Sequence, residues 1–383
     1  MQIAMLLHKS VEHDSRVRRE AKALALDGHE VTVLHLPRSP GPCDGPTDSF
    51  AVQSVTPPAW VRRRLPFAIY RLVFFFAFVR ALGRLRPDAV HAHDAAMLAP
   101  GYAGAKLVGA RLVYDTHEYA AGVPYRERTW AWFVTMLERL VVPRCHVVIT
   151  VSEGIADRLA ERYRLAQRPI VVRNVPDEHM YDTAFVAPDL RSHVGMAPEA
   201  SLVLHLGAVA ADRGCEVLVR AMGEVDPPTE LVFLGADDKD YVEHLRKVVG
   251  GAGVAKRVHF LPSVPVEQVL AYTRQASVGV SLLEDTCENH RLALPNKVFE
   301  YIAAGVGVVV SDLPELRRLA TKESAMVTTR VDPASVAAAL NTTLGRGADV
   351  CPANRSSSWP DECEALLAAY AAARAVGMEN ENA

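Results

Sequence analysis

The stretch LPNKVFEYIAAGVGVVVSD, Leu294–Asp312, joins a short helix to a buried strand. Pro295 suits the first position of a helix, and Gly305 suits the residue just past the end of one. The three valines at 308–310 form an apolar run of the kind found in buried parallel strands. The stretch therefore predicts a helix that packs on a parallel sheet, and an α/β fold.

The loop before this helix is placed where α/β proteins bind ligands. Another apolar strand, Ser277–Leu283, precedes it, so residues 284–294 form the loop at the carboxyl end of that strand. Open α/β sheets bind ligands at this edge, and the N–H groups of a first helical turn favour an anion such as phosphate. Glu300, one turn into the helix, is a candidate acceptor for the vicinal diol of a ribose, or else a solvated helix residue.

Length and composition indicate a globular protein with two domains. The chain has 383 residues, half of them hydrophobic, and a net charge of −3. Such a charge gives no general reason to expect a nucleic-acid partner. Arginine is commoner than lysine and alanine is abundant, which hints at a GC-rich bacterial genome.

Cysteine usage and the start of the chain favour a cytoplasmic protein. The six cysteines include no close pair, which argues against a zinc ribbon, a CxxC redox site or a disulfide framework. Met1 leads directly into an apolar strand, without the pattern of a secretory signal. The longest apolar run, Leu72–Val79, is too short to cross a bilayer.

The chain opens with a β-α-β pattern that lacks a dinucleotide fingerprint. We expect a strand at Gln2–Leu7, a helix at Ser15–Asp27 with Asp14 as its N-cap, and a strand at Glu30–Leu36. No glycine precedes Gly28, so the phosphate-binding pattern GxGxxG is absent. A dehydrogenase therefore loses its main support.

A basic and aromatic segment, Trp60–Arg86, follows a loop predicted at Pro37–Pro58. Such a segment is able to lie on an anionic membrane surface, which would place the protein at the inner membrane face. The alternative is a core helix with a charged outer face, and we favour it because the aromatic residues also fit packing on a sheet.

Polar residues follow two further predicted strands, Ala89–Ala92 and Arg111–Tyr114. His93 and Asp94 come after the first, and the run 115–118, DTHE, comes after the second. Consecutive strand ends are the usual position of site residues in such sheets. A lone histidine there also has a simpler explanation, a hydrogen-bonded structural role.

The second half of the chain repeats the pattern of the first. Its other predicted strands are Leu202–Leu206, Leu231–Leu234, Val258–Leu261 and Ala325–Thr328. We expect two Rossmann-like α/β domains, at 1–180 and 198–357, which face each other across a deep cleft. A C-terminal helix from Trp359 and a tail, together 358–383, are expected to pack on the first domain.

Several segments together resemble the retaining GT-B glycosyltransferases, and within them glycosyltransferase family four. The matching segments are Asp14–Leu34 (DSRVRREAKALALDGHEVTVL), Pro87–Asp94 (PDAVHAHD), Val113–Tyr119 (VYDTHEY), Val148–Leu159 (VITVSEGIADRL), Val171–Asp177 (VVRNVPD), Arg213–Met222 (RGCEVLVRAM) and Pro295–Asp312. They occur in family order and cover nearly the whole chain, which makes a chance match a poor explanation.

The resemblance implies a role for five residues. Glu300 matches the second glutamate of the family's E-x7-E motif, which holds the donor ribose. Asn296 and Lys297 match the positions whose backbone N–H groups meet the diphosphate, and Arg213 matches the cation that neutralises the departing nucleoside diphosphate. His117 matches the histidine of the first domain that approaches the transferred sugar. Family members use no metal here, so no metal and no cofactor are expected.

The sequence departs from the family pattern at the sugar and at the first loop. Leu292 replaces the first glutamate of E-x7-E, so Asn289 and His290 become the candidates that read the sugar hydroxyls. Ala208 stands where many members have an arginine. A usual glycine-rich first loop is replaced by His13-Asp14-Ser15-Arg16, and we assign Asp14, Arg16 and His93 to the acceptor side.

We expect a hexosyltransferase that uses a nucleoside diphosphate sugar, retains the anomeric configuration and needs no metal. The spacing of Asp238 and Asp240 matches a metal-binding D-x-D motif, but the pair is placed to cap a helix that begins near Tyr241. Two alternatives remain, a nucleotide-sugar epimerase of the same fold and a nucleotide-sugar-binding protein without activity. The acceptor, the sugar and the oligomeric state do not follow from the sequence.

Overall fold

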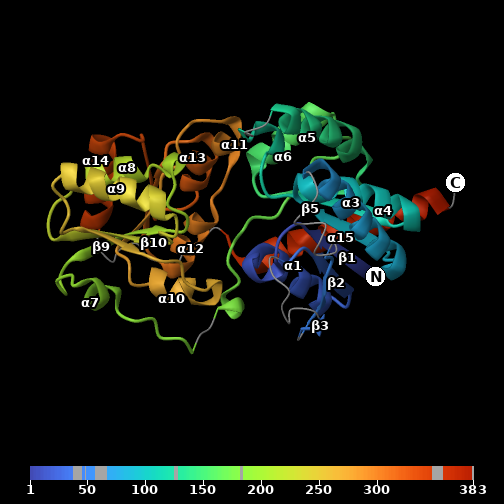
Figure 1. Cartoon of the computed structure of the whole chain (residues 1–383), viewed down its shortest axis with the longest axis horizontal. Helices are drawn as coiled ribbons and strands as arrows, with labels where there is room; N and C mark the ends of the chain where they lie inside the picture. Colours follow the sequence, from blue (N-terminus) through green and yellow to red (C-terminus); the bar gives the residue numbers. More distant parts are fainter. Residues whose placement is uncertain are drawn as a thin grey trace. The chain divides into compact units, whose positions relative to one another are not determined.

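The chain folds into two α/β units, each built around a sheet (Figure 1). The computed structural model describes residues 1–37, 45–47, 49–56, 67–124, 128–181, 184–346 and 357–381. The first unit contains Met1–Arg173 and Pro360–Ala383, and the second contains Asn174–Trp359. The chain therefore passes into the second unit after Arg173 and returns to the first at Pro360.

The first unit has an eight-stranded sheet in the order β3-β4-β2-β1-β5-β6-β7-β8. Its strands are β1 Gln2–Leu7, β2 Glu30–His35, β3 Gly45–Pro46, β4 Ala51–Ser54, β5 Ala89–His93, β6 Arg111–Thr116, β7 Val147–Thr150 and β8 Ile170–Val171. The short β3–β4 pair is antiparallel, and the other pairs are parallel. Parallel strands buried on both faces explain their nearly continuous apolar sequences.

Helices and short 3₁₀ turns connect these strands. They are η1 Val11–His13, α1 Ser15–Leu26, α3 Phe67–Leu85, α4 Asp94–Val108, η2 Ala120–Gly122, α5 Arg128–Val141, η3 Val142–Arg144, α6 Glu153–Tyr163 and α15 Trp359–Glu381. The last helix packs on the first unit through buried Leu366, Ala369 and Tyr370, and the Tyr370 hydroxyl lies 2.8 Å from His91 Nδ1 on β5. The C-terminal helix thus crosses back to the first domain.

The second unit has a fully parallel six-stranded sheet in the order β11-β10-β9-β12-β13-β14. Its strands are β9 Ser201–Leu206, β10 Thr229–Leu234, β11 Val258–Leu261, β12 Val278–Ser281, β13 Gly307–Ser311 and β14 Met326–Thr329. Its helices and turns are η4 Glu178–Met180, α7 Leu190–Val194, η5 Ala211–Arg213, α8 Cys215–Ala221, α9 Lys239–Gly251, η6 Val266–Gln268, α10 Val269–Thr273, α11 Glu288–Leu292, α12 Asn296–Ala304, α13 Pro314–Ala320 and α14 Pro333–Gly345.

Both sheets reverse their strand order at one point. In the first unit the reversal lies between β1 and β5, and in the second it lies between β9 and β12. Loops that leave the carboxyl ends of two such strands diverge to opposite faces and open a crevice, where α/β proteins bind ligands. The expected pair of parallel-sheet α/β domains is confirmed, and each sheet has one such reversal, at which we expect the crevice.

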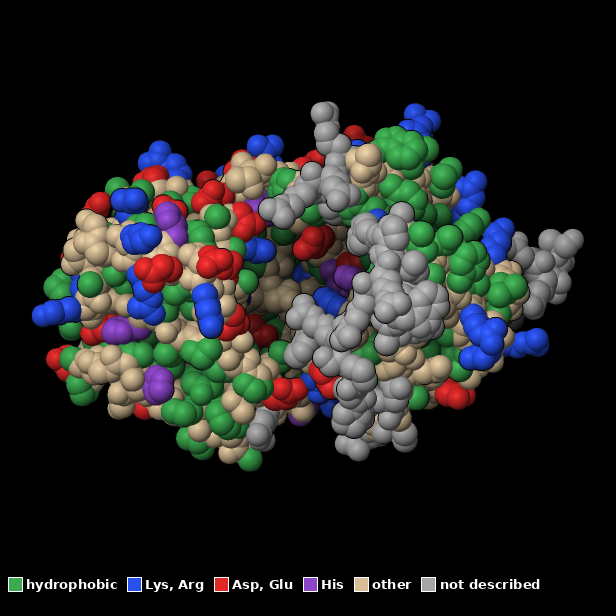
Figure 2. Space-filling view, in the orientation of Figure 1, with side chains coloured by type: hydrophobic (Ala, Val, Ile, Leu, Met, Phe, Trp, Pro, Cys, Tyr) green, Lys and Arg blue, Asp and Glu red, His purple; other side chains and the backbone are tan. Residues whose placement is uncertain are grey.

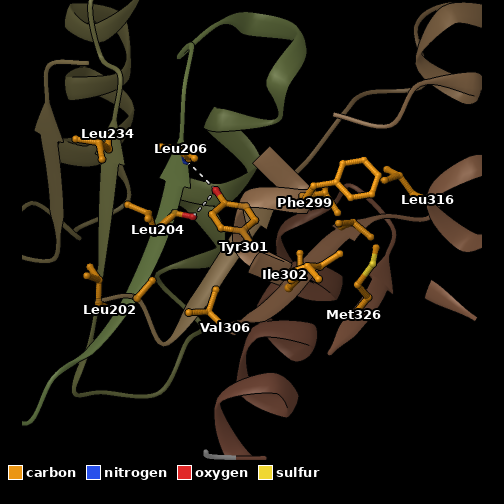
Figure 3. Packing of buried hydrophobic residues seen from close by; sticks show 14 of the residues in the cluster. Leu202, Leu204, Leu206, Leu234, Phe299, Tyr301, Ile302, Val306, Leu316 and Met326 are labelled. Carbon is orange, nitrogen blue, oxygen red and sulfur yellow. Dashed lines mark hydrogen bonds between the residues drawn. The ribbon is translucent and has the colours of Figure 1, made fainter. Parts of the chain in front are cut away.

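Tyr301 fixes α12 to the centre of the second sheet (Figure 3). Its fully buried hydroxyl accepts the Leu206 N–H at 2.8 Å and lies 3.0 Å from the carbonyl oxygen of Leu204, both on β9. Gly279 on β12 makes room for the ring, because a Cβ there would lie 2.2 Å from it. The position of α12 at the crevice is therefore set by the hydrogen bonds of the Tyr301 hydroxyl and by the space that glycine leaves at position 279.

Three predicted boundaries are corrected. Pro295 is the N-cap of α12 and not its first residue, and the loop 284–294 contains the short helix α11. The predicted surface loop Pro37–Pro58 includes β4, which pairs with β2, while residues 38–44, 48 and 57–58 lie outside the described part of the chain. A strand of two to four residues forms because it pairs with a neighbouring strand. The composition of the segment alone therefore does not predict it.

The predicted basic and aromatic helix is present as α3. Residues 60–66 at its start lie outside the described residues. Phe78 and Leu82 are fully buried, which agrees with a helix that packs on the domain core. In the described part of the chain, no helix combines the length and the apolar character needed to span a bilayer.

Candidate functional site

The crevice of the second unit is closed at one side by the turn after β9. This turn ends at Arg213 in η5, followed by Gly214 with a φ of +61°. A Cβ at Gly214 would lie 2.6 Å from the Cβ of Leu282, just past β12, so only glycine allows this approach. The Glu284 N–H also donates to the Asp212 carbonyl at 3.3 Å. Arg213 is thereby held beside the loop that follows β12.

Lys297 lies in the first turn of α12 and points its ammonium group into this crevice. Its Nζ is 3.2 Å from Nε2 of His205 on β9. Desolvation, reinforced by repulsion from Arg213, lowers the pKa of Lys297 to about 7. Desolvation, reinforced by repulsion from Lys297, holds the pKa of His205 well below its usual range. Arg213 Nε also lies 3.6 Å from Asp212 Oδ1, so one carboxylate is already present, and an added anion would further relieve the repulsion between Arg213 and Lys297.

The start of α12 adds backbone donors to the same crevice. Asn296 is its first residue, and Pro295 at the N-cap has no side chain that caps the helix by a hydrogen bond. N–H groups in a first turn carry partial positive charge. Asn296, Lys297 and Arg213 thus bring backbone and side-chain positive charge to one strand edge.

Asn289 and His290 are buried in α11, within the loop after β12. His290 Nδ1 lies 2.7 Å from the Glu284 carbonyl oxygen, and its Nε2 lies 3.5 Å from Asp212 Oδ2. These contacts tie the loop to the turn that carries Arg213. The structure gives His290 a clear positioning contact, and its predicted contact with the sugar stays a prediction.

Glu300 lies one turn further along α12 and has a neighbour that the sequence did not indicate. Its Oε2 accepts a hydrogen bond from the Tyr181 hydroxyl at 2.6 Å. Tyr181 stands 119 residues earlier in the chain, just after the VVRNVPD segment. No local pattern marks it, because its position depends on how residues 174–181 lie against the second sheet. A ligand diol at Glu300 has to share the carboxylate with Tyr181 or displace it.

The crevice of the first unit begins at Asp14, which caps α1. One of its oxygens accepts the Val17 N–H at 3.1 Å, and the other lies 2.9 Å from Lys9 Nζ. Burial alone would raise the pKa of Asp14, but His117 and Lys9 outweigh it and hold that pKa well below its usual range. The predicted N-cap is confirmed, and the carboxylate also joins the charges around His117.

Arg16 and Asp115 form a buried two-pronged ion pair. Arg16 Nε and Nη2 each lie 2.9 Å from an Asp115 oxygen, and Nη1 donates to the Val172 carbonyl at 2.6 Å. Asp115 is fully buried and Arg16 is 3% exposed. Two parallel N–H to oxygen bonds give such a pair a fixed orientation. Despite burial, the guanidinium and His117 keep the pKa of Asp115 well below its usual range.

His117 lies between two carboxylates. Its Nε2 is 3.1 Å from Asp115 Oδ2, its Nδ1 is 3.6 Å from Asp94 Oδ2, and its backbone N–H donates to Asp94 Oδ1 at 3.1 Å. Burial opposes a charged ring, but the attraction of Asp94 and Asp115 outweighs it and raises the pKa of His117 to about 9. The ring is therefore an imidazolium at neutral pH.

Asp94 holds an uncommon backbone conformation to reach His117. Its φ is +62°, although it carries a side chain and opens α4. Residues in this region cost of order 1–3 kcal/mol and persist where surrounding contacts hold them, often at functional sites. The strained start of α4, the hydrogen bond from the His117 N–H and the ion-pair contact with the His117 ring thus all mark Asp94 as part of the site.

His93 lies beneath His117 in a cluster of buried ionisable side chains. Its Nδ1 is 3.2 Å from Asp115 Oδ2, and its ring stacks on that of His91 with centroids 4.2 Å apart. Glu20, His91, His93 and Asp115 together have the ligand types of a metal site. Arg16 Nε, however, lies 2.9 Å from both carboxylates and already supplies a positive charge between them.

The structure thus brings the predicted acceptor-side residues together around His117. Asp14, Arg16 and His93 are all buried, so each acts first on its neighbours within the unit. Lys9 and Asp94, which the sequence reasoning did not assign, complete the group. In the sequence, only the position of Asp94 directly after His93, at the end of a strand, marks it.

Comparison with solved structures places the fold in a known class. Sucrose-phosphate synthase from Thermosynechococcus elongatus is 18% identical with a TM-score of 0.72, and the match covers 100% of this chain and 99% of that chain. HepE from Anabaena, in a complex with UDP-glucose, is 15% identical with a TM-score of 0.70, and the match covers 98% of this chain and 99% of that chain. The two α/β units are those of the GT-B class.

Sequence matches to family models identify the family. Residues 15–176 match Glycosyltransferase Family 4, and residues 200–346 match Glycosyl transferases group 1. Each match lies almost entirely within one unit, and together they cover most of the chain. The chain therefore belongs to the glycosyltransferases of family four, as the seven matching segments predicted.

The curated relatives match only part of the chain. D-Inositol 3-phosphate glycosyltransferase of Geodermatophilus obscurus is 27% identical over 198 residues, which are 48% of this chain and 43% of that protein. The matched region thus spans less than half the length of this relative. Its acceptor and its sugar remain properties of that protein.

Proposed function

We propose that the protein transfers a hexosyl group from a nucleoside diphosphate sugar to an acceptor hydroxyl, with retention at the anomeric carbon and without a metal. The observation that carries the proposal is the pair Arg213 and Lys297 at the second crevice, whose repulsion helps to lower the pKa of Lys297 to about 7. A diphosphate is the ligand class that matches two cations, the first turn of α12 and a diol acceptor at Glu300.

The same groups support a role in the chemical step. When the glycosidic bond to the donor breaks, negative charge develops on the leaving diphosphate. Arg213, Lys297 and the N–H groups at the start of α12 are aimed at that charge before the reaction begins. Such preorganised electrostatic stabilisation is usually the largest single contribution to catalysis.

The proposal that no metal is needed has two supports in the second unit. Arg213 and the first turn of α12 already supply positive charge, and Lys297 would add to it once a bound diphosphate raises its pKa. Asp238 of the D-x-D spacing accepts the N–H groups of Asp240 and Tyr241, both at 3.1 Å, and so caps α9. This carboxylate has a structural role in the second unit.

His117 is proposed to contact the transferred sugar, in keeping with the family motif. The two carboxylates that make it an imidazolium would let it donate a hydrogen bond to a sugar hydroxyl. Retention of configuration and the hexosyl identity rest on the family resemblance.

Donor binding is tested by titration calorimetry of UDP-glucose and UDP at pH 8, in buffers of different ionisation enthalpy. Because Lys297 is largely neutral at this pH, a bound diphosphate should raise its pKa and draw in a proton. Lys297→Met should abolish the proton uptake and weaken binding, while Lys247→Met, at an exposed lysine of α9, should do neither. Binding without proton uptake would contradict the assigned diphosphate position.

Transfer itself is separated from the two alternatives by product analysis. A transferase releases nucleoside diphosphate faster when an acceptor is added, whereas an epimerase changes the sugar without an acceptor. A binding protein does neither. Release that is independent of every acceptor tried, together with a changed sugar, would favour the epimerase.

A further inference from the structure

Exposed apolar side chains gather on one part of the first unit. In the described part of the chain, nine large hydrophobic side chains are exposed, and seven of them lie on α3, α4 and α5. They are Ile69, Leu72, Phe76, Leu107, Trp132, Phe133 and Leu140. Figure 2 shows hydrophobic side chains concentrated over these helices, with lysine and arginine side chains beside them. A monomeric protein seldom exposes such a patch without a binding role.

The exposed side of α3 changes along the helix from apolar residues to arginines. Ile69, Leu72 and Phe76 are followed on the same side by Arg80 and Arg84, with the three- and four-residue spacing of one helical face. Its opposite side buries Phe78 and Leu82 in the core. The helix therefore shows apolar groups to solvent over its first half and cations over its second half.

An apolar groove of about 590 Å³ runs between α3, α4 and α5. Its lining residues are Arg71, Leu72, Phe74, Phe75, Ala96, Ala99, Pro100, Thr129, Trp130 and Phe133. The Arg71 guanidinium lies 3.1 Å from the centre of the Trp130 ring, which stacks on Phe133. A cation held over an aromatic ring keeps its charge at the rim while the ring contributes apolar surface.

The charge of this region has a single sign among the described side chains. The sequence of α3 contains no aspartate or glutamate. In α5, Glu138 is fully buried and accepts hydrogen bonds from Tyr114 and Tyr163, both at 2.9 Å. The only acid of α4 is Asp94, at the His117 site. Among the described side chains of α3, α4 and α5, the exposed charged ones are Arg80, Arg84, Lys106 and Arg139.

We infer that α3, α4 and α5 form a docking face for an anionic lipid bilayer. Aromatic and aliphatic groups beside arginines are the composition of helices that lie in a membrane interface, and anionic headgroups match the uniform positive charge. A second copy of the chain fits less well, because a symmetric contact would place these arginines against their own counterparts. The inference goes beyond glycosyl transfer and holds whether or not the proposed donor is correct.

The full chain is tested by co-sedimentation with vesicles of phosphatidylcholine, with and without phosphatidylglycerol. We expect binding to the anionic vesicles that weakens as salt rises. The double variants Leu72→Ser with Phe76→Ser, and Arg80→Glu with Arg84→Glu, should each lower the vesicle affinity about tenfold or more. Leu26→Ser and Val186→Ser, at exposed side chains outside the face, are matched controls that should bind like the wild type.

A second readout locates the contact. Lipids brominated in the acyl chain should quench the fluorescence of Trp130 and Trp132, the two tryptophans of α5, and replacing both with phenylalanine should remove most of that quenching. Equal binding to neutral and anionic vesicles, unchanged binding by both double variants, or no binding by the wild type would each overturn the inference. A wild-type dimer in solution that either double variant dissociates would assign the face to a second copy instead.

Discussion

The two crevices differ in how their charges are balanced. In the first unit, the cations Arg16, Lys9 and His117 each face a carboxylate at close range, and the pair of Arg16 and Asp115 is buried. In the second unit, Arg213 Nε lies 3.6 Å from Asp212 Oδ1, and the repulsion between Arg213 and Lys297 helps to lower the pKa of Lys297. A site with internal balance can hold a side chain in one charge state, whereas a site with excess positive charge is ready for an anion.

The largest expected effect comes from breaking the internal balance of the first crevice. Arg16→Met would leave Asp115 and Glu20 buried without their guanidinium, and removing one partner of a buried pair costs about 3–5 kcal/mol. Urea unfolding should show this loss, and Arg84→Met, at an exposed arginine of α3, should be close to neutral. Adding Asp115→Asn to Arg16→Met should recover part of the loss. Simple additivity of the two changes would show that they are not coupled.

Stability should depend on pH in opposite directions at the two crevices. His117 has a folded-state pKa of about 9, above its ordinary 6.5, so its stabilising effect is complete below pH 6.5 and is lost as the pH rises through 9. The difference corresponds to roughly 3 kcal/mol. Lys297 has a folded-state pKa of about 7, below its ordinary 10.5, so stability is regained as the pH rises from 7 to 10.5.

Two variants separate these contributions in unfolding measurements between pH 6 and 10. His117→Gln should remove the loss of stability, and Lys297→Met should remove the gain. A pH profile that neither variant changes would mean that other groups dominate the linkage.

Removing Arg213 should affect the proposed reaction more than donor binding. Its charge matters most when the leaving diphosphate becomes negative, so Arg213→Ala should lower kcat by about a hundredfold, with a smaller rise in KM. Steady-state kinetics with UDP-glucose provide the measurement, and Arg220→Ala on α8 is the control. A change in KM alone would make Arg213 a ground-state binding residue.

A smaller effect is expected at Glu300. Glu300→Gln should weaken donor binding at least tenfold, since charge-assisted hydrogen bonds contribute roughly 1.5–3 kcal/mol. Tyr181→Phe should bind the donor at least as tightly as the wild type, because it frees Glu300 from the hydroxyl at 2.6 Å. Calorimetric dissociation constants decide both points. Weaker binding by Tyr181→Phe would instead make Tyr181 part of the donor site.

The smallest expected effect is that of metal removal. With Arg213, Lys297 and α12 available for the diphosphate, turnover should persist in excess EDTA. Asp238→Asn with Asp240→Asn should leave the rate within a few-fold of the wild type, apart from a weaker cap on α9. Activity lost in EDTA and restored by magnesium or manganese would contradict the metal-free proposal.

Much of the fold could be predicted from local patterns. The strand Val258–Leu261 has the predicted bounds, and Asp14 caps the helix that its position indicated. Gly305 ends α12 in a left-handed conformation, as the amino acid suggested. These features depend on a few neighbouring residues, so sequence alone contains the necessary information.

The contacts of the site residues were not predictable in the same way. The ion pair of Arg16 and Asp115 joins residues 99 apart in the sequence, and the hydrogen bond from Tyr181 to Glu300 joins residues 119 apart. The sequence placed His93, Asp115 and His117 at strand ends, but it did not show that one Asp115 oxygen lies within 3.2 Å of both histidines. Such distances depend on strand order and register.

By itself, the sequence determined the family, the two parallel-sheet domains and the residues at their strand ends. Helix caps, apolar runs and ordered motifs are local, and they keep their meaning wherever the segment lies. Only the tertiary structure decided the electrostatic state of those residues. Desolvation and the distance to the next charge set the pKa of His117 and Lys297, and both quantities exist only after distant strands have packed side by side.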